Sequence, residues 1–423
     1  MVGLHKHRDS LPKPLKNNYN QILKMSSQIP IINPKFDTDE FQDNIHRHYR
    51  DLINESPVFI NKEGIVYLTR YEDCSKLLGG KQFKRNPPQG SGPFSKAGQA
   101  LGPVEQTVSL WMLFMDQPRH DVVRKAFTLP FMPKAIEALE PFIIKRAQEL
   151  LQRISLQGEV ELLKNFCYPL PVMVIAEILG VPSEDLDLFY QWSAKLTAAM
   201  DSGTPEGMEA GTEVVGLMTR YFDTLLARAE TLPAHSLIRM LHNDPMQLTA
   251  AELNSGLTFL LWSGHETTKN LISSGLQLLA ERPAVLKELK ERPELITSAV
   301  EEMLRFDSPV QKVSRWVHED TVFGGFTIPS GTMITALIGA AHQDATAFSD
   351  PETFNIHRQE NRHIAFGIGL HRCMGSTLAR LEAHVAFKAF LPLIKELRPV
   401  RHHWRTLSAF RSLDELVVEV TPA

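Results

Sequence analysis

The sequence has few cysteines, no long apolar run and no excess of basic residues. Its three cysteines, Cys74, Cys167 and Cys373, stand far apart, so they form neither a disulfide framework nor a zinc-ligand pattern. Lysine and arginine total 45 against 49 aspartates and glutamates, whereas a nucleic-acid binder usually carries a basic domain or stripe. No stretch approaches the roughly 18 charge-free apolar residues of a membrane span, and the polar N-terminus lacks the apolar core of a secretory signal. We therefore expect a soluble, cytoplasmic protein with no nucleic-acid partner and no membrane anchor.

The pattern of apolar residues along the chain predicts a mainly α fold with a smaller β portion. With 43% hydrophobic residues, the chain can bury a large core. Residues 1–34 are polar and contain several prolines, so we expect an N-terminal arm followed by a single domain over residues 35–423. Helical patterns cover residues 117–307 and 375–395, whereas the glycine- and proline-rich residues 80–109 are typical of a long irregular loop. Short strands are predicted at residues 57–60, 65–69, 313–318, 322–326, 333–337 and 404–421.

One predicted helix is unusually long and has a polar stretch after a buried middle. It begins with a capping box formed by Thr249 and Glu252, whose side chains satisfy free N–H groups of the first turn. The pattern continues to Arg282, where Pro283 prevents continuation. Residues 263–268 are mostly polar, although the turns before them are apolar on all sides. Polar groups inside a buried helix need partners or a purpose, so this stretch is a candidate functional site.

The strongest motif is the ten-residue segment F-G-I-G-L-H-R-C-M-G at residues 366–375. Glycines let the backbone approach a bound group closely. Cys373 stands just before a predicted helix, whose positive end would lower the pKa of the thiol. A shorter motif would be read as a glycine-rich loop with a buried cysteine. All six fixed positions of F-G-x-G-x-H-x-C-x-G are present, however, and the segment resembles the cysteine loop of the cytochrome P450 family.

This resemblance extends over residues 35–423 and implies a fold, a cofactor and a metal ligand. The fold is a triangular helical prism with a long central helix over the cofactor. The cofactor is haem b (iron protoporphyrin IX), with the Cys373 sulfur as the iron ligand and with Phe366 and Gly367 beside it. Such a thiolate ligand donates electron density and favours O–O cleavage. The sequence departs from the family pattern at residues 116–118 and 342–345, which puts only local turn geometry in doubt.

Charged residues elsewhere match family positions that hold the haem carboxylates or the cysteine loop. Burying two propionates needs cationic partners, although each such residue alone is more often a surface cation. The resemblance implies that the propionate partners are His120, Arg124, Arg315 and His371. On sequence grounds an E-x-x-R pair is often only an exposed pair one helical turn apart. The family's buried E-x-x-R pair and its additional arginine, which have a structural role, match Glu302, Arg305 and Arg358.

The polar stretch of the long helix matches the family's acid–alcohol pair, A/G-G-x-D/E-T. The resemblance implies that Glu266 and Thr267 relay protons to dioxygen, because a hydroxyl beside a carboxylate can pass protons through water. A solvated polar patch is the alternative interpretation. Family position also predicts a set of substrate-pocket residues, for which plain core packing is the alternative. These residues are Leu260, Ser263, which replaces the usual alanine, Gly264, Val310 and Val313.

The functional hypothesis is a haem-thiolate monooxygenase. It would take two electrons from a ferredoxin or flavodoxin with its NAD(P)H reductase, activate O2, and hydroxylate or epoxidise an apolar small molecule such as a secondary metabolite. Arg372, Lys125 and Arg119 would present positive charge to the acidic partner. The alternatives are a hydrogen-peroxide-driven peroxygenase, in which an acid–alcohol pair is atypical, a haem-binding sensor or carrier without turnover, and a helical scaffold without a cofactor.

Overall fold

The computed structural model describes residues 28–88, 101–202, 205–243, 246–406 and 409–423. Most of the arm expected over residues 1–34 therefore lies outside the described residues. Its last part packs on the domain, because Ile29 is buried and Ile31 forms a parallel bridge with Ile60. None of the described helices is long and apolar enough to cross a membrane.

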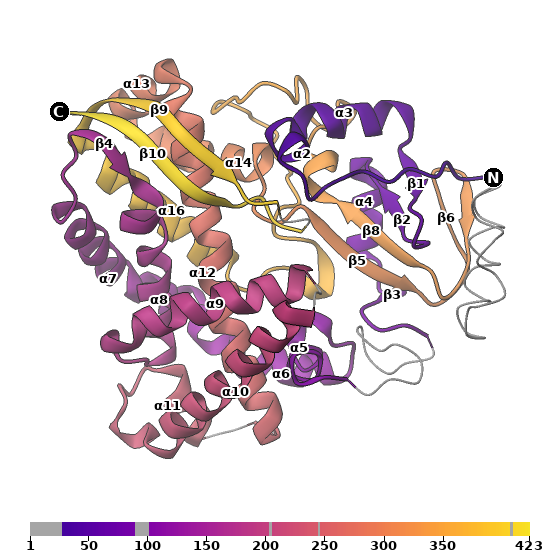
Figure 1. Cartoon of the computed structure of the whole chain (residues 1–423), viewed down its shortest axis with the longest axis horizontal. Coiled ribbons are helices and arrows are strands. Elements are labelled where there is room, and N and C mark those ends of the chain that lie inside the picture. Colours follow the sequence, from indigo (N-terminus) through magenta and orange to yellow (C-terminus); the bar gives the residue numbers. More distant parts are fainter. Residues whose placement is uncertain (1–27, 89–100, 203–204, 244–245, 407–408) are drawn as a thin grey trace.

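Helices make up the larger part of the molecule, as the periodicity predicts. The helical side contains α7, α8, α9, α10, α11, α12 and α16, and the five-stranded sheet lies on the opposite side in Figure 1. The helices are α2 (Asp39–Asp43), α3 (Ile45–Glu55), α4 (Tyr71–Gly79), α5 (Pro103–Ser109), α6 (Arg119–Thr128), α7 (Pro133–Gln152), α8 (Pro169–Leu179), α9 (Leu186–Ser202), α10 (Pro205–Ala227), α11 (Leu237–Asn243), α12 (Ala250–Ala280), α13 (Pro283–Glu291), α14 (Ile296–Phe306), α15 (Ile338–Ala341) and α16 (Ser376–Phe390).

The strands form a five-stranded sheet in the order β1-β2-β8-β5-β3, a three-stranded sheet in the order β4-β10-β9, and the hairpin β6-β7. In the first sheet only β2 and β8 pair in parallel. The strands are β1 (Val58–Ile60), β2 (Val66–Leu68), β3 (Phe83–Lys84), β4 (Gly158–Glu161), β5 (Lys312–Val317), β6 (Thr321–Phe323), β7 (Phe326–Ile328), β8 (Met333–Leu337), β9 (Ile394–Trp404) and β10 (Leu413–Pro422).

Some local predictions were wrong. The loop expected over residues 80–109 contains α5 and β3 in its described parts, because Pro103 pre-forms the first helical turn and Val104 and Val108 then bury on one face. Strand β9 was missed, and β4 interrupts the stretch expected to be helical. On β9 only Ile394, Leu397 and Trp404 are buried. The strand lies at an edge of its sheet, where charged side chains are favoured and obscure the alternation.

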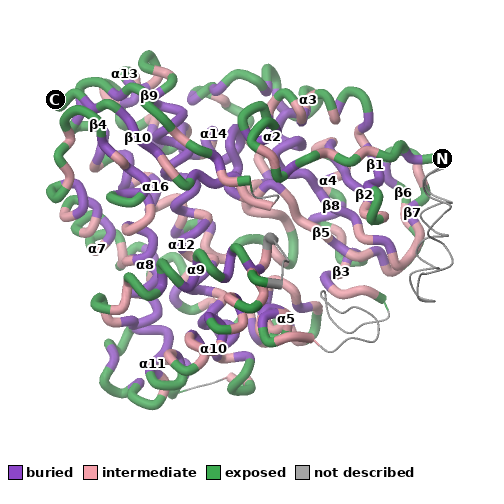
Figure 2. Tube along the Cα trace, viewed as in Figure 1, coloured by how far each residue is buried: buried purple, intermediate pink, exposed green. Residues whose placement is uncertain are grey.

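Helix α12 crosses the middle of the molecule and is buried along most of its length (Figure 2). The expected capping box is present: Thr249 Oγ1 accepts from the backbone N–H of Glu252, and the Glu252 carboxylate accepts from that of Thr249. The helix packs against α8, α10, α14 and α16 and against β10. It is therefore a rigid support for any side chain that it presents to a cavity.

Two of the three cysteines belong to the core. Cys74 and Cys167 are fully buried, and burial raises the pKa of both thiols. They are small hydrophobic residues, as the wide spacing indicates. Cys373 alone among the three has accessible surface, and that surface faces a cavity inside the protein, so the sulfur is still surrounded by protein atoms.

Candidate active site

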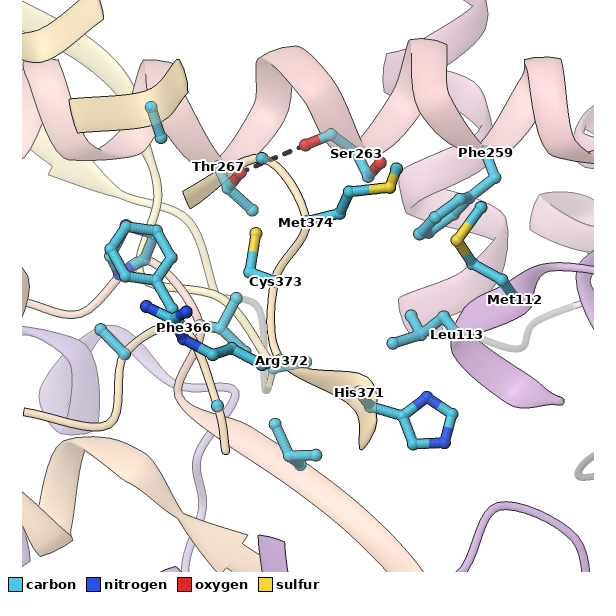
Figure 3. Close-up of a pocket in the computed structure, with 18 of the residues that line it drawn as sticks. Met112, Leu113, Phe259, Ser263, Thr267, Phe366, His371, Arg372, Cys373 and Met374 are labelled. Carbon is cyan, nitrogen blue, oxygen red and sulfur yellow. Dashed lines mark hydrogen bonds between the residues drawn. The ribbon is translucent and has the colours of Figure 1, made fainter. Parts of the chain in front are cut away.

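The segment before α16 forms a tight loop that presents the Cys373 sulfur. The Cys373 N–H donates to the Phe366 carbonyl oxygen at 2.8 Å. Gly367 and Gly369 have φ of 66° and 71°, a left-handed conformation that favours glycine. A Cβ on Gly369 would also come within 3.3 Å of the Gly79 Cα. In Figure 3 the Cys373 sulfur points from this loop towards the side of α12 that carries Thr267.

The loop by itself does not ionise the thiol. Burial raises the pKa of Cys373, and the backbone N–H of Gly375 and the charges of Arg124 and Arg372 only partly oppose that effect. The lowering that the helix end was expected to cause is therefore outweighed by burial. A metal ion on the sulfur would remove the proton, since coordinating thiols are deprotonated. A metal ion bound to this sulfur would therefore add to the effects that favour the thiolate, namely the Gly375 N–H and the nearby arginines.

A cavity of about 530 Å³ lies between this loop and α12. Cys373 and Phe366 belong to one wall and Thr267 to the facing wall (Figure 3). Aromatic and thioether side chains from several elements form much of the rest. The five residues placed in the substrate pocket by family position all line the cavity: Leu260, Ser263, Gly264, Val310 and Val313.

Cations gather in the wall of this cavity. Arg124, Arg315 and His371 line it, and the ring of the fully buried His120 lies 4.5 Å from that of His371. Burial, then the charges of Arg85 and Arg315, lower the pKa of His371 to about 2. Burial also lowers the pKa of Arg315 to about 10. An anionic ligand would relieve the repulsion that these lowered pKa values reflect.

The group implied by the sequence fits this wall. Among the described residues His120 Nε2 is buried without a hydrogen-bond partner, although Nδ1 lies 3.0 Å from the Asp121 carboxylate. Glu382 is the acidic residue of the wall among the described residues, and burial raises its pKa well above the ordinary value, so it does not neutralise the cations. The two propionates of haem b would supply the missing negative charge, with Cys373 positioned as the sulfur ligand.

Arg85 is a cation that the sequence reasoning missed. It is 7% exposed, lines the cavity, and donates to the carbonyl oxygens of Leu113 and Ser314. The Asp116 carboxylate accepts from the backbone N–H of Arg85 at 2.9 Å and of Asn86 at 3.0 Å, which fixes the backbone there. Arg85 lies in a glycine- and proline-rich stretch without a periodic pattern of apolar residues, so the sequence did not indicate that its side chain would be buried.

The predicted acid–alcohol pair is divided between two environments. Thr267 lines the cavity and its hydroxyl donates to the Ser263 carbonyl oxygen at 3.2 Å (Figure 3). Glu266 does not line the cavity. Its carboxylate accepts from Lys269 Nζ at 2.7 Å and lies 3.7 Å from the Arg405 guanidinium. The sequence analysis identified neither cation, although Lys269 stands one helical turn after Glu266.

Glu302, Arg305 and Arg358 form one buried cluster rather than an exposed pair. The Arg305 guanidinium contacts the Glu302 carboxylate at 2.7 Å, and the Arg358 Nε contacts it at 3.1 Å. Arg305 also donates to the carbonyl oxygens of His342 and Pro351. The cluster therefore ties α14 to the segments that precede the cysteine loop.

The three residues suggested for docking are not equivalent. Lys125 and Arg372 are exposed. Arg119 is held by the Glu252 carboxylate at the start of α12. Lys125 and Arg372 therefore remain as cations available to an acidic partner.

Comparisons with known proteins agree with this geometry. The family model Cytochrome P450 matches residues 228–393. The biotin biosynthesis cytochrome P450 of Bacillus subtilis is 35% identical over 90% of this chain and 97% of its own length. The vitamin D(3) 25-hydroxylase of Pseudonocardia autotrophica is 36% identical over 82% of this chain and 85% of its own length.

Solved structures extend the likeness to the whole fold. A cytochrome P450 in complex with an acyl carrier protein ligated to hexadec-9Z-enoic acid has a TM-score of 0.85 and 33% identity, over 90% of this chain and 99% of that one. A Bacillus megaterium enzyme in complex with testosterone has a TM-score of 0.81 and 31% identity, over 90% and 99%. Together with the cysteine loop, these relationships show that the chain belongs to the cytochrome P450 family of haem-thiolate monooxygenases.

Proposed function

We propose that this enzyme inserts one oxygen atom from O2 into a neutral, largely apolar small molecule. The overall reaction consumes the substrate, O2, two electrons and two protons, and it releases the hydroxylated or epoxidised product and water. Bound haem b would supply the iron at which O2 is reduced. The single observation that carries the proposal is the Cys373 sulfur, which faces a cavity whose wall also holds the cations for two propionates.

Four cationic positions support binding of the haem. We assign His120, Arg124, Arg315 and His371 to the propionates, because three of them line the cavity and the fourth has a buried Nε2 with no partner in the part of the chain that the structure describes. Phe366 and Gly367 line the cavity beside Cys373 and would limit the access of water to the sulfur.

Thr267 and Glu266 are proposed as the proton relay. The Thr267 hydroxyl lies in the cavity wall opposite Cys373 and can hold a proton-carrying water there. Glu266, the preceding residue, has a carboxylate in contact with other ionisable groups. Glu302, Arg305 and Arg358 have a structural role in this scheme.

The cavity wall supports a neutral substrate with a large apolar surface. Phe259, Trp262 and Phe410 supply aromatic surface, and Met112 and Met200 supply flexible thioethers. Among the relatives, one is named for vitamin D(3) hydroxylation and one structure contains testosterone. We therefore favour polycyclic neutral molecules over charged ones.

Electrons would come from a ferredoxin or flavodoxin reduced by an NAD(P)H reductase. Lys125 and Arg372 are exposed, and Arg372 lies in the loop that carries Cys373. An acidic partner attracted to these cations would dock close to the sulfur ligand. A peroxygenase is less favoured, because the Thr267 hydroxyl in the cavity wall suits proton delivery to O2.

The decisive experiment compares the reduced, carbon-monoxide-treated protein with its cysteine variants. The wild type is expected to show the Soret position typical of thiolate ligation, and Cys373→His the position typical of imidazole. Cys74→Ser and Cys167→Ser are matched controls and should keep the thiolate spectrum. A thiolate spectrum in Cys373→His, or product formation with peroxide but none with O2 and an electron donor, would overturn the proposal.

A further inference from the structure

Helix α12 contains a buried ion pair between two residues that lie one helical turn apart, next to the proposed proton relay. The Lys269 ammonium donates to Glu266 Oε1 at 2.7 Å, and the two side chains are only 6% and 7% exposed. Moving two charges out of water costs several kcal/mol per ion unless further hydrogen bonds compensate. A buried lysine in a helix that packs on all sides therefore needs a reason beyond stability.

The pair is anchored to the segment between β9 and β10. Lys269 Nζ donates to Ser412 Oγ at 3.2 Å, and Arg405 lies 3.7 Å from the Glu266 carboxylate. The Arg405 N–H donates to the Ser412 carbonyl oxygen at 2.8 Å, so the two residues are held together. The side chain of Arg405 is 24% exposed, which gives this cluster contact with solvent.

The same segment reaches the substrate cavity. Phe410 lines the cavity and packs edge-on against Trp262 of α12, with ring centroids 5.8 Å apart. Thus a single chain segment contacts both the substrate space, through Phe410, and the ion pair, through Ser412.

The charges around Glu266 favour its ionised form. Burial alone would raise the pKa of Glu266, but attraction to Lys269, His265 and Arg405 lowers it below the ordinary value. Burial lowers the pKa of His265, whose Nδ1 lies 2.6 Å from the Leu261 carbonyl oxygen. Tyr168, from the start of α8, also faces Glu266, and burial and the Glu266 charge raise the pKa of that phenol. Lys269 is the cation in direct hydrogen-bond contact.

We propose that Lys269 is a positioning residue for oxygen activation: it holds Glu266 ionised and fixes the carboxylate between α12 and the β9–β10 segment. This inference rests on the proposed monooxygenase function. Glu266 then accepts a proton from the solvent side near Arg405, gives it up towards the water held by Thr267, and returns to the carboxylate. Two such transfers supply the two protons of each turnover.

The test is the pH dependence of coupling, measured as product formed per NAD(P)H consumed. In Lys269→Met the carboxylate loses its nearest cation, so the pKa of Glu266 rises. The acid limb of the coupling profile should then move to higher pH by about one unit or more. Lys269→Arg keeps the charge and should restore the profile. Lys287→Met, which breaks an exposed helical pair with Glu291, is the matched control and should leave the profile unchanged.

Hydrogen peroxide separates this role from general damage. Peroxide and substrate together contain all the atoms and electrons of the product and water, so product formation with peroxide should persist in Lys269→Met. A thiolate carbon-monoxide spectrum confirms that the variant is folded. A failure of the proposed monooxygenase function would give a different result: the wild-type protein itself would lack the thiolate carbon-monoxide spectrum or would form no product.

A pH profile of Lys269→Met that superimposes on the wild type would overturn the inference. If Lys269→Met does not fold, the double variant Glu266→Gln/Lys269→Met removes both charges, a change that buried pairs often tolerate. In this double variant the product formed per NAD(P)H consumed should be low at every pH, and it should no longer decrease as the pH is lowered. A double variant with the wild-type profile contradicts the role of the pair as clearly as the single variant would.

Discussion

The buried guanidinium of Arg85 is placed where it could interact with a haem propionate. It donates to two main-chain carbonyl oxygens and contacts no carboxylate among the described residues, yet it shares the cavity wall with Arg315 and His371. Its charge adds to the repulsion among the cations of this wall, and a propionate would relieve that repulsion. The guanidinium is therefore expected to contribute to haem retention.

Arg85→Ala should accelerate the loss of haem roughly ten- to hundredfold, because a hydrogen bond to a charged group is worth about 1.5–3 kcal/mol. Arg85→Lys should recover part of this loss. The measurement is the rate of haem transfer from the protein to a haem-scavenging apoprotein at low salt. Lys81→Ala, an exposed neighbour, is the control. Equal rates for Arg85→Ala and the control would remove Arg85 from the binding set.

Thr267→Ala should lower the product formed per NAD(P)H consumed by about tenfold or more and divert reducing equivalents to peroxide, since positioned proton donors typically contribute 10²–10⁴-fold. Thr267→Ser keeps the hydroxyl and should retain most coupling. Peroxide release is measured together with NAD(P)H consumption. Unchanged coupling in Thr267→Ala would exclude the hydroxyl from the relay.

The sequence predicted residues within contiguous motifs better than residues brought together by folding. Cys373 and Thr267 were found because each lies in a short pattern, and the structure places both in one cavity. Arg85 and Arg405 were not found, because no sequence pattern links them to the site. Lys269 has the i, i+3 spacing of a helical ion pair with Glu266, but this spacing does not reveal that the pair is buried. Long-range charge contacts depend on tertiary packing.

At the scale of elements, the buried cluster around Glu302 joins α14 to the segment before the cysteine loop. Glu302→Gln should leave two buried arginines without their counter-charge and destabilise the protein by about 3–5 kcal/mol. Glu291→Gln, in an exposed pair, should cost less than about 1 kcal/mol. Urea unfolding followed by circular dichroism measures both. If the two variants lost similar amounts of unfolding free energy, the buried cluster would contribute no more to stability than an exposed ion pair.

Elements with sharp boundary signals were predictable and elements with mixed composition were not. Helix α12 was delimited by its capping box and by Pro283, and β8 matches residues 333–337. The prediction failed at α5, in a glycine- and proline-rich stretch, and at β9, an edge strand with many charges. In both cases the neighbours in space, rather than the local sequence, determine the conformation.

For the whole molecule, the net charge of −4 means that an acidic redox partner must find a local positive region. Lys125→Glu and Arg372→Glu should slow the reduction of the haem by the partner, and the wild-type rate should fall as ionic strength rises. Lys395→Glu, an exposed change on β9, is the control. Stopped-flow reduction at several salt concentrations measures this. A salt-independent rate would place docking elsewhere.

The cavity draws its wall from Leu78 near one end of the described chain to Phe410 near the other. During synthesis, therefore, the pocket cannot close until Phe410 has left the ribosome. A nascent chain that already carries Cys373 still lacks the aromatic ring of Phe410 and the strand β10 that supports it. Haem captured earlier would remain open to solvent, so a chain that lacks Phe410 and β10 should lose cofactor before it loses helix.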